Sequence, residues 1–263
     1  QTYVDYALEN GIVQAGDFTS YTAKATRGQM AYLFSRALPA TVLPSINNVQ
    51  TLPDVTSSTK YSQEIFSLYN AGVLTGSDVF GTFKPNDNII RAEAAAILTR
   101  VALPEQRKTV VLMKQVQWGN AKIAVPQSAG AGVTENGYFS VSSQQDLCVA
   151  VANAATDKNF KGYNITKLFT PDSMSQMIAT AFSTNDVQFK NMGTKTVTFG
   201  ALKAYRTTGS ALFNEGNYNC VVYTYISGDT MSMILLMAYE NDIALQNMAN
   251  GLMVGGVTAS PQF

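Results

Sequence analysis

The first 104 residues contain two similar segments in the same order, and this internal repeat limits the fold more than any other feature of the chain. Gly11 is followed by Arg27 in the first segment, and Gly72 is followed by Arg91 in the second. In each segment an apolar pattern with helical spacing precedes the glycine, and a second such stretch ends shortly before a proline. Units of this size cannot bury their apolar faces alone, so the two copies must pack together.

This pattern predicts an all-α helical repeat bundle over residues 1–106, with a partial first repeat at 1–40 and a second repeat at 52–104. Beyond a short charged stretch at 105–108 the apolar period changes from helical to alternating, which predicts a domain boundary. We expect residues 109–263 to form an α+β domain with an antiparallel sheet and flanking helices.

Local signals place the elements of this second domain. Helices are predicted at 171–183, with Thr170 as the N-cap, and at 240–253. The run Ser227-Gly228-Asp229 is typical of a hairpin turn. Strands are predicted at 122–125, 138–142, 147–152, 187–189, 202–207, 220–226 and 232–239.

Composition excludes several classes of function. The chain has no histidine, which excludes Ser-His-Asp triads, Cys-His pairs and His-ligated zinc or copper. Its 18 basic and 18 acidic residues are divided equally between the two parts, so neither part offers the positive field that nucleic-acid binding needs. No apolar run approaches the roughly 20 residues that span a bilayer. The start at Gln1 fits a processed secreted protein or a trimmed chain.

Two side-chain groups in the second domain allow two interpretations each. Cys148 and Cys220 have apolar neighbours in the sequence, which favours two buried thiols over a disulfide without excluding the disulfide. Four tyrosines alternate on predicted strands and fit either a ligand platform or, more often, cross-strand packing. They are Tyr218, Tyr223, Tyr225 and Tyr239.

The segment Thr26-Arg-Gly-Gln29 fits a capping box, which makes Arg27 the first residue of a helix. Arg91 occupies the matching position in the second segment. A cation at the positive end of a helix dipole costs about 0.3–1 kcal/mol unless an anion compensates it. Both arginines are therefore candidates for binding an anionic ligand such as a carboxylate, or for pairing with an acidic side chain such as Asp54 or Glu9.

The second segment resembles the S-layer homology (SLH) repeat. The matching motifs are Leu52-Pro-Asp54-Val55, Gly72-Val-Leu-Thr-Gly76, Gly81-Thr-Phe83-Lys-Pro85 and Ile89-Ile-Arg91-Ala92-Glu93. The resemblance implies noncovalent attachment to a secondary cell-wall polysaccharide that often carries ketal-linked pyruvate. It also implies that Arg27 and Arg91 meet the pyruvyl carboxylate, and that Gly11, Gly72 and Gly76 permit close approach of the ligand.

Departures from the SLH pattern concern both segments. The first lacks the Phe-x-Pro element and the aromatic-x-Asp opening, and Ile90 replaces the capping Thr in the second. SLH repeats commonly occur in threes, so either a third repeat lies upstream or in another chain, or this bundle is incomplete.

The second domain resembles the PsbP-like α/β/α sandwich in its order of elements, which implies a small adaptor or ligand-binding domain. The sequence thus predicts a secreted cell-surface protein that is anchored to an anionic wall polysaccharide. No catalytic residue, cofactor, metal, nucleic acid or transmembrane segment is expected. Two alternatives remain open: a wall-carbohydrate enzyme that uses Asp and Glu, and a module that binds another protein.

Overall fold

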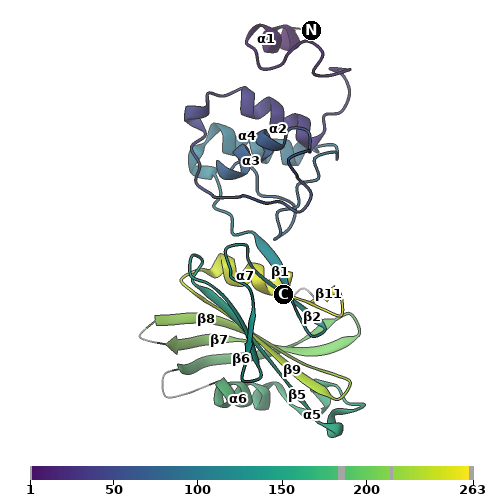
Figure 1. The fold of residues 1–263 in the computed structure, drawn as a ribbon, viewed down its shortest axis with the longest axis vertical. Coiled ribbons are helices and arrows are strands. Elements are labelled where there is room, and N and C mark those ends of the chain that lie inside the picture. Colours follow the sequence, from purple (N-terminus) through teal and green to yellow (C-terminus); the bar gives the residue numbers. More distant parts are fainter. Residues whose placement is uncertain (1, 183–186, 214–215, 261–263) are drawn as a thin grey trace. The chain divides into compact units, whose positions relative to one another are not determined.

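The computed structural model describes residues 2–182, 187–213 and 216–260 (Figure 1). It separates into two compact units, which we call unit 1, up to Val110, and unit 2, from Val111 onward.

Unit 1 contains short helices joined by long connecting segments (Figure 1). The capping box predicted at the start of the second helix is present, because Gln29 N donates to Thr26 Oγ1 at 3.2 Å and Thr26 N donates to Gln29 Oε1 at 2.8 Å. Two 3₁₀ turns, Ala40–Val42 and Pro104–Gln106, follow the second and fourth helices. The α-helices are α1 (Thr2–Glu9), α2 (Arg27–Arg36), α3 (Ser62–Asn70) and α4 (Arg91–Ala102).

Each repeat contains a similar internal contact, made by an arginine near the end of its second helix. Arg36 at the end of α2 donates to the carbonyls of Gly11 and Ile12, each at 3.0 Å. Arg100 in α4 donates to Val73 O at 3.1 Å. Each arginine thus donates to the main chain at or directly after the turn glycine of its own repeat.

The expectation of an all-α bundle for residues 1–106 is wrong, and the chain as a whole is a mixed α+β protein. Helix α1 contributes no buried residue. Isolated β-bridges join Leu52 to Val55 and Thr26 to Asn88. Helices of 8 to 12 residues are too short to enclose a core alone, so extended segments complete it. The buried apolar residues of these segments include Val49, Leu52, Val55 and Phe83.

Unit 2 consists of two antiparallel sheets. The smaller sheet has the order β1-β2-β10-β11, and the larger has the order β3-β4-β5-β9-β8-β7-β6. The strands of the smaller sheet are β1 (Met113–Trp118), β2 (Ala121–Pro126), β10 (Met253–Val254) and β11 (Val257–Thr258). Those of the larger are β3 (Val133–Glu135), β4 (Tyr138–Ser143), β5 (Cys148–Thr156), β6 (Val187–Phe199), β7 (Leu202–Phe213), β8 (Gly216–Ser227) and β9 (Thr230–Tyr239).

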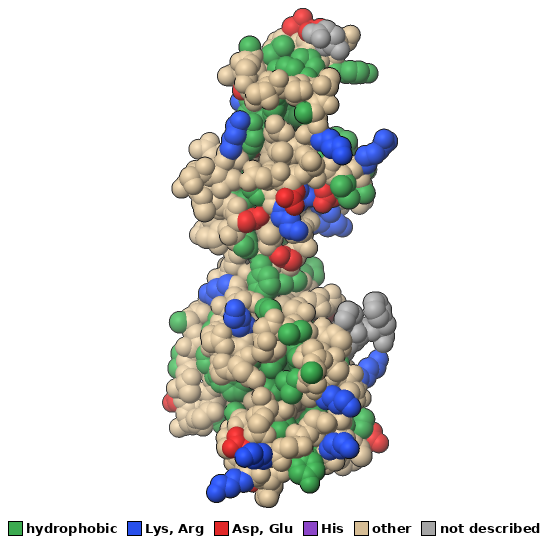
Figure 2. Space-filling model, turned by 90° about the vertical axis from the view of Figure 1, so that its right-hand side faces the viewer, with side chains coloured by type: hydrophobic (Ala, Val, Ile, Leu, Met, Phe, Trp, Pro, Cys, Tyr) green, Lys and Arg blue, Asp and Glu red, His purple; other side chains and the backbone are tan. Residues whose placement is uncertain are grey.

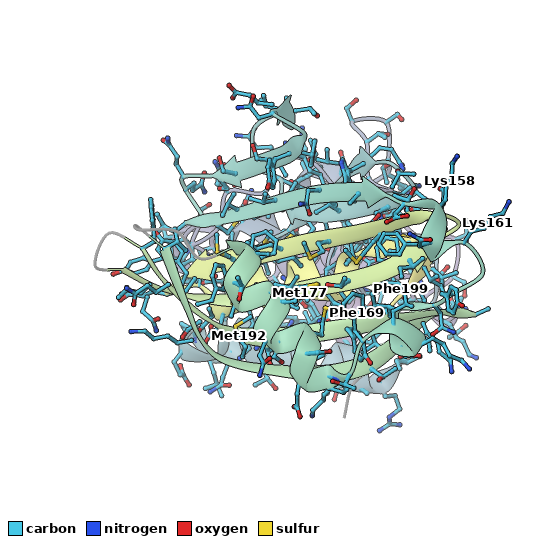
Figure 3. All side chains as sticks on the ribbon, turned by 90° about the horizontal axis from the view of Figure 1, so that it is seen from below. Lys158, Lys161, Phe169, Met177, Met192 and Phe199 are labelled. Atoms are coloured by element: carbon cyan, nitrogen blue, oxygen red, sulfur yellow. The ribbon has the colours of Figure 1, made fainter. Side chains whose placement is uncertain are left out.

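Helices lie on both faces of the larger sheet (Figure 1). Helices α5 (Ile165–Leu168) and α6 (Pro171–Phe182) cover one face, after a 3₁₀ turn at Lys158–Phe160. Figure 3 shows Phe169 and Met177 lying over this face, and both pack against a buried cluster that includes Leu235. Helix α7 (Asp242–Gly251) lies on the other face, where it packs on β8 and β9 and on the smaller sheet.

Most elements predicted for the second part overlap elements of the structure. All seven predicted strands overlap observed ones, although β6, β7 and β8 are longer than predicted. Gly228, at a φ of +68°, lies in the two-residue turn of the β8–β9 hairpin. Ser173 N donates to Thr170 Oγ1 at 3.2 Å, so Thr170 caps α6, whereas the predicted last residue of this helix, Ser183, lies outside the described residues.

The two cysteines and the four tyrosines for which the sequence allowed two interpretations have structural roles in unit 2. Cys148 and Cys220 are buried free thiols on two strands separated by β9. Of the tyrosines, Tyr218 and Tyr239 form a cross-strand pair with ring centroids 5.2 Å apart. Tyr223 and Tyr225 are buried on the opposite face against the ring of Phe199. The four rings therefore do not share one platform.

Candidate functional site

Arg27 is buried at the start of α2 and is held by the second repeat. Its Nη1 lies 2.6 Å from Glu93 Oε1, and its Nε donates to Phe83 O at 2.6 Å. Its guanidinium also lies 5.0 Å from the centroid of the Phe83 ring. The acidic partner is thus Glu93, not the Asp54 or Glu9 considered from the sequence. Asp54 instead accepts the main-chain N–H groups of Phe83 and of the residue after it.

The main-chain donors in the first turn of α2 also have protein partners. Arg27 N donates to Asp87 O at 2.8 Å, and Gly28 N donates to Pro85 O at 2.9 Å. A Cβ at Gly28 would lie only 3.0 Å from Pro85 O, so the absence of a side chain permits this approach. The third donor, Gln29 N, donates to Thr26 Oγ1 in the capping box. The start of α2 is therefore closed by the segment 83–87 of the second repeat.

The start of α4 differs sharply from that of α2. Arg91 is exposed, and the N–H of Ile90 donates to Glu93 Oε2 at 3.2 Å. Within the described ranges, no hydrogen-bond acceptor pairs with the N–H groups of Arg91, Ala92 and Glu93, and the Arg91 guanidinium has no ion pair. Free N–H groups at a helix start, together with a cation, produce a local positive potential. This end of α4 can receive an anion.

The three glycines assigned to close approach have positive φ angles, and two of them lie against the protein's own chain. A Cβ at Gly72 (φ +72°) would lie 2.7 Å from Lys108 O. A Cβ at Gly76 (φ +78°) would lie 2.7 Å from Gly81 Cα. Gly11 (φ +66°) has no neighbouring atom within 4 Å of that position. The structure thus gives Gly72 and Gly76 an internal packing role, while the position of Gly11 is open.

A recess that the sequence reasoning missed lies between α1, the connecting segment 13–25 and α2. Its cavity volume is about 260 Å³, and Lys24 adds a cation to its lining. Ala25 also lines it, and Ala25 O accepts the N–H of Ile89, just before α4, at 3.0 Å. The available signal was a run of aromatic and hydroxyl residues before the capping box. Three aromatic side chains line the recess: Tyr3, Phe18 and Tyr21.

One titratable pair lies beside this region. Tyr32 donates to Asp17 Oδ2 at 2.5 Å, and this bond is the main reason that the pKa of Asp17 is lowered. Burial, aided by the same bond, raises the pKa of Tyr32 to about 12. The phenol therefore stays protonated at neutral pH and fixes the position of the carboxylate.

Surface charge and metal ligands are two further features of the described residues. Figure 2 shows positive and negative side chains interspersed on the visible face. In the parts of the chain that the structure describes, His, Cys, Asp and Glu side chains form no cluster able to hold a metal ion. Among the same residues, no helix has the length and apolar character needed to cross a membrane.

Comparison with known proteins identifies the second repeat. The S-layer homology domain model matches residues 51–95, which include Asp54, Gly72, Phe83 and Arg91. The predicted first repeat at 1–40 lies outside this match. No curated protein matches the chain.

Similar solved structures include two bacterial proteins. One, from Bacteroides thetaiotaomicron, is 8% identical over 51% of this chain and 45% of that chain, with a TM-score of 0.33, so the match spans less than half of that protein. The other is LpqN, involved in cell envelope biogenesis of Mycobacterium tuberculosis, which is 16% identical over 57% of this chain and 92% of that chain, with a TM-score of 0.33. Similarity at this level assigns neither fold nor function, and the PsbP-like resemblance of residues 109–263 stays a prediction.

The family comparison and the motifs agree on the same segment and the same residues. Residues 51–95 form an S-layer homology domain, which supports attachment of the chain to the cell wall at the cell surface.

Proposed function

We propose that unit 1 attaches this secreted protein noncovalently to an anionic wall polysaccharide that carries ketal-linked pyruvate. The difference between the two helix starts supports this most directly. The start of α2 is closed by protein contacts, whereas α4 presents exposed Arg91 and three free N–H groups in the described structure. A planar guanidinium binds a carboxylate through paired hydrogen bonds. We assign the pyruvyl carboxylate to Arg91, and we assign to Arg27 the role of holding the second repeat in place.

The aromatic recess supports a carbohydrate ligand. Tyr21 and Tyr3 are exposed at its edge, and aromatic rings offer apolar faces on which sugar rings stack. Ala25 connects this recess to the segment that enters α4. We propose that sugars next to the bound carboxylate stack on these rings.

Cosedimentation with purified wall polysaccharide tests the proposal. Arg91→Ala should weaken retention at least about tenfold, because it removes a charge-assisted contact. Arg91→Lys should weaken retention less than Arg91→Ala does. Lys122→Ala, which removes an exposed cation from β2, should leave retention unchanged. Equal retention by de-pyruvylated polymer, or normal retention of Arg91→Ala, would contradict the carboxylate role.

A third SLH repeat, upstream or in another chain, is a second candidate for the start of α4. It is favoured by the observation that segment 83–87 of the second repeat covers the start of α2. Such a repeat would compete with the carboxylate for Arg91. Analytical ultracentrifugation without polysaccharide separates the two: chain association that Arg91→Ala abolishes supports the repeat, and a monomer that binds polysaccharide supports the carboxylate.

We propose that unit 2 displays or binds a ligand and does not catalyse a reaction. An acid–base mechanism requires carboxylates that converge on a recess. Unit 2 has one recess beside Arg206 and Ser260 and another beside Cys148 and Met237, and the lining of neither contains Asp or Glu. Release of reducing sugar from wall carbohydrate by the purified chain, abolished by substitution of a unit 2 carboxylate, would overturn this proposal.

A further inference from the structure

A second recess, in unit 2, combines polar donors with an arginine. It lies between the end of α7, strands β7 and β8, and the segment 258–260, and its cavity volume is about 260 Å³. Ser260 is fixed at its edge, because Ser260 N donates to Thr198 O at 2.8 Å. The polar side chains of the lining are Arg206, Tyr223, Asn250, Thr258 and Ser260.

Arg206 has no acidic partner in the described part of the chain, where the ion pair of Arg27 is the one salt bridge. Strands β6 and β7 carry Lys190, Lys195, Lys203 and Arg206 but no Asp or Glu. Lys195 lies directly opposite Arg206 in the antiparallel register. Like charges at opposite positions destabilise a sheet, so an anion beside this pair would be stabilising.

Tyr223 adds a directed donor to the recess. It is buried and lies directly opposite Arg206 in the register of β7 and β8, so its hydroxyl and the guanidinium line the same recess. Burial raises the pKa of Tyr223, so the phenol stays protonated at neutral pH. A protonated phenol can donate its O–H to a ligand in the recess.

The plainer role for Arg206 is to offset the negative end of α7, which ends at Gly251 beside the recess. That role would need neither a cavity nor the hydroxyls of Thr258 and Ser260 around it. A guanidinium beside several neutral donors matches a carboxylate that also carries hydroxyl groups. The volume lies just below the usual range for ligand sites and fits a molecule of about monosaccharide size.

We propose that this recess binds a small organic carboxylate of about monosaccharide size, with Arg206 holding the carboxylate and Tyr223 donating to it. The site is separate from the wall attachment assigned to unit 1, and it does not depend on Arg91. It gives unit 2 a ligand-binding role of its own.

Titration calorimetry of the full chain with sodium glucuronate tests the site, with glucose as the uncharged control and inorganic phosphate as the competing anion. We expect binding of glucuronate and none of glucose. Arg206→Met should weaken binding at least about tenfold, and Tyr223→Phe several-fold. Lys203→Met is the matched control, because it removes a cation from the opposite face of β7 and should leave binding unchanged.

Arg206→Lys provides a second variant if Arg206→Met fails to fold. It keeps the charge but loses the planar fork, so it should fold and bind more weakly than the native chain. The proposal is overturned if glucuronate does not bind, if glucose binds equally, if phosphate binds more tightly, or if a folded Arg206 variant keeps full affinity. These outcomes leave the polysaccharide test of Arg91 untouched, so the two proposals fail separately.

Discussion

Removing Arg27 should destabilise unit 1, whereas removing Arg91 should not. Arg27→Ala deletes a hydrogen bond to Phe83 O, an ion pair with Glu93 and a contact with the Phe83 ring. A hydrogen bond from a charged group contributes about 1.5–3 kcal/mol and the ring contact about 0.5–1 kcal/mol. The Glu93 side chain is 39% exposed, so we assign the ion pair itself little additional stabilisation. The expected loss is about 2–4 kcal/mol for Arg27→Ala and within about 0.5 kcal/mol for exposed Arg91→Ala.

Hydrogen exchange of peptides from unit 1, read by mass spectrometry, is the suitable assay because a chain with two compact units need not unfold in one step. Arg27→Ala should raise exchange in α2 and in the segment 83–87, and Arg91→Ala should match the native chain. Unchanged exchange in Arg27→Ala would refute the reasoning that this arginine joins the two repeats.

Three further predictions concern single groups. Gly72→Ala should destabilise unit 1 by more than about 1 kcal/mol in urea titration, because the new Cβ meets main-chain atoms at a positive φ. Burial raises the pKa of Cys148 to about 11 and that of Cys220 to about 12, so at pH 8 only about one thiol in a thousand or fewer is ionised, and both should react with a disulfide reagent only after denaturation. Tyr32→Phe should raise the pKa of Asp17 toward its ordinary value in an NMR titration. Because the folded pKa of Asp17 is depressed, its stabilising contribution is present above the ordinary carboxyl pKa and is lost as the pH falls through the folded value.

The sequence predicted features that depend on neighbouring residues. The capping box at Thr26, the cap at Thr170 and the hairpin turn at Gly228 each follow from a few adjacent side chains, and the structure contains all three. The S-layer homology motif from Asp54 to Glu93 could also be identified from the sequence, because its residue types and their spacing are specific to that domain.

Contacts between distant segments could not be read in this way. Arg27 and Phe83 are 56 positions apart, so the burial of that arginine depends on how the repeats pack. Helical periodicity reveals helices but not the extended segments that carry Val49 and Leu52 into the core, which is why an all-α bundle was expected. The recess beside Lys24 likewise depends on the approach of α1 to the segment before α2.

The most direct test of the account follows the backbone N–H resonances of unit 1 by NMR while a pyruvylated fragment of wall polysaccharide is added. The account predicts that the signals of Arg91, Ala92 and Glu93 shift on binding, while those of Arg27 and Gly28, whose N–H groups are already bonded within the protein, do not. Shifts confined to Arg27 and Gly28, or identical shifts with a fragment lacking pyruvate, would contradict it.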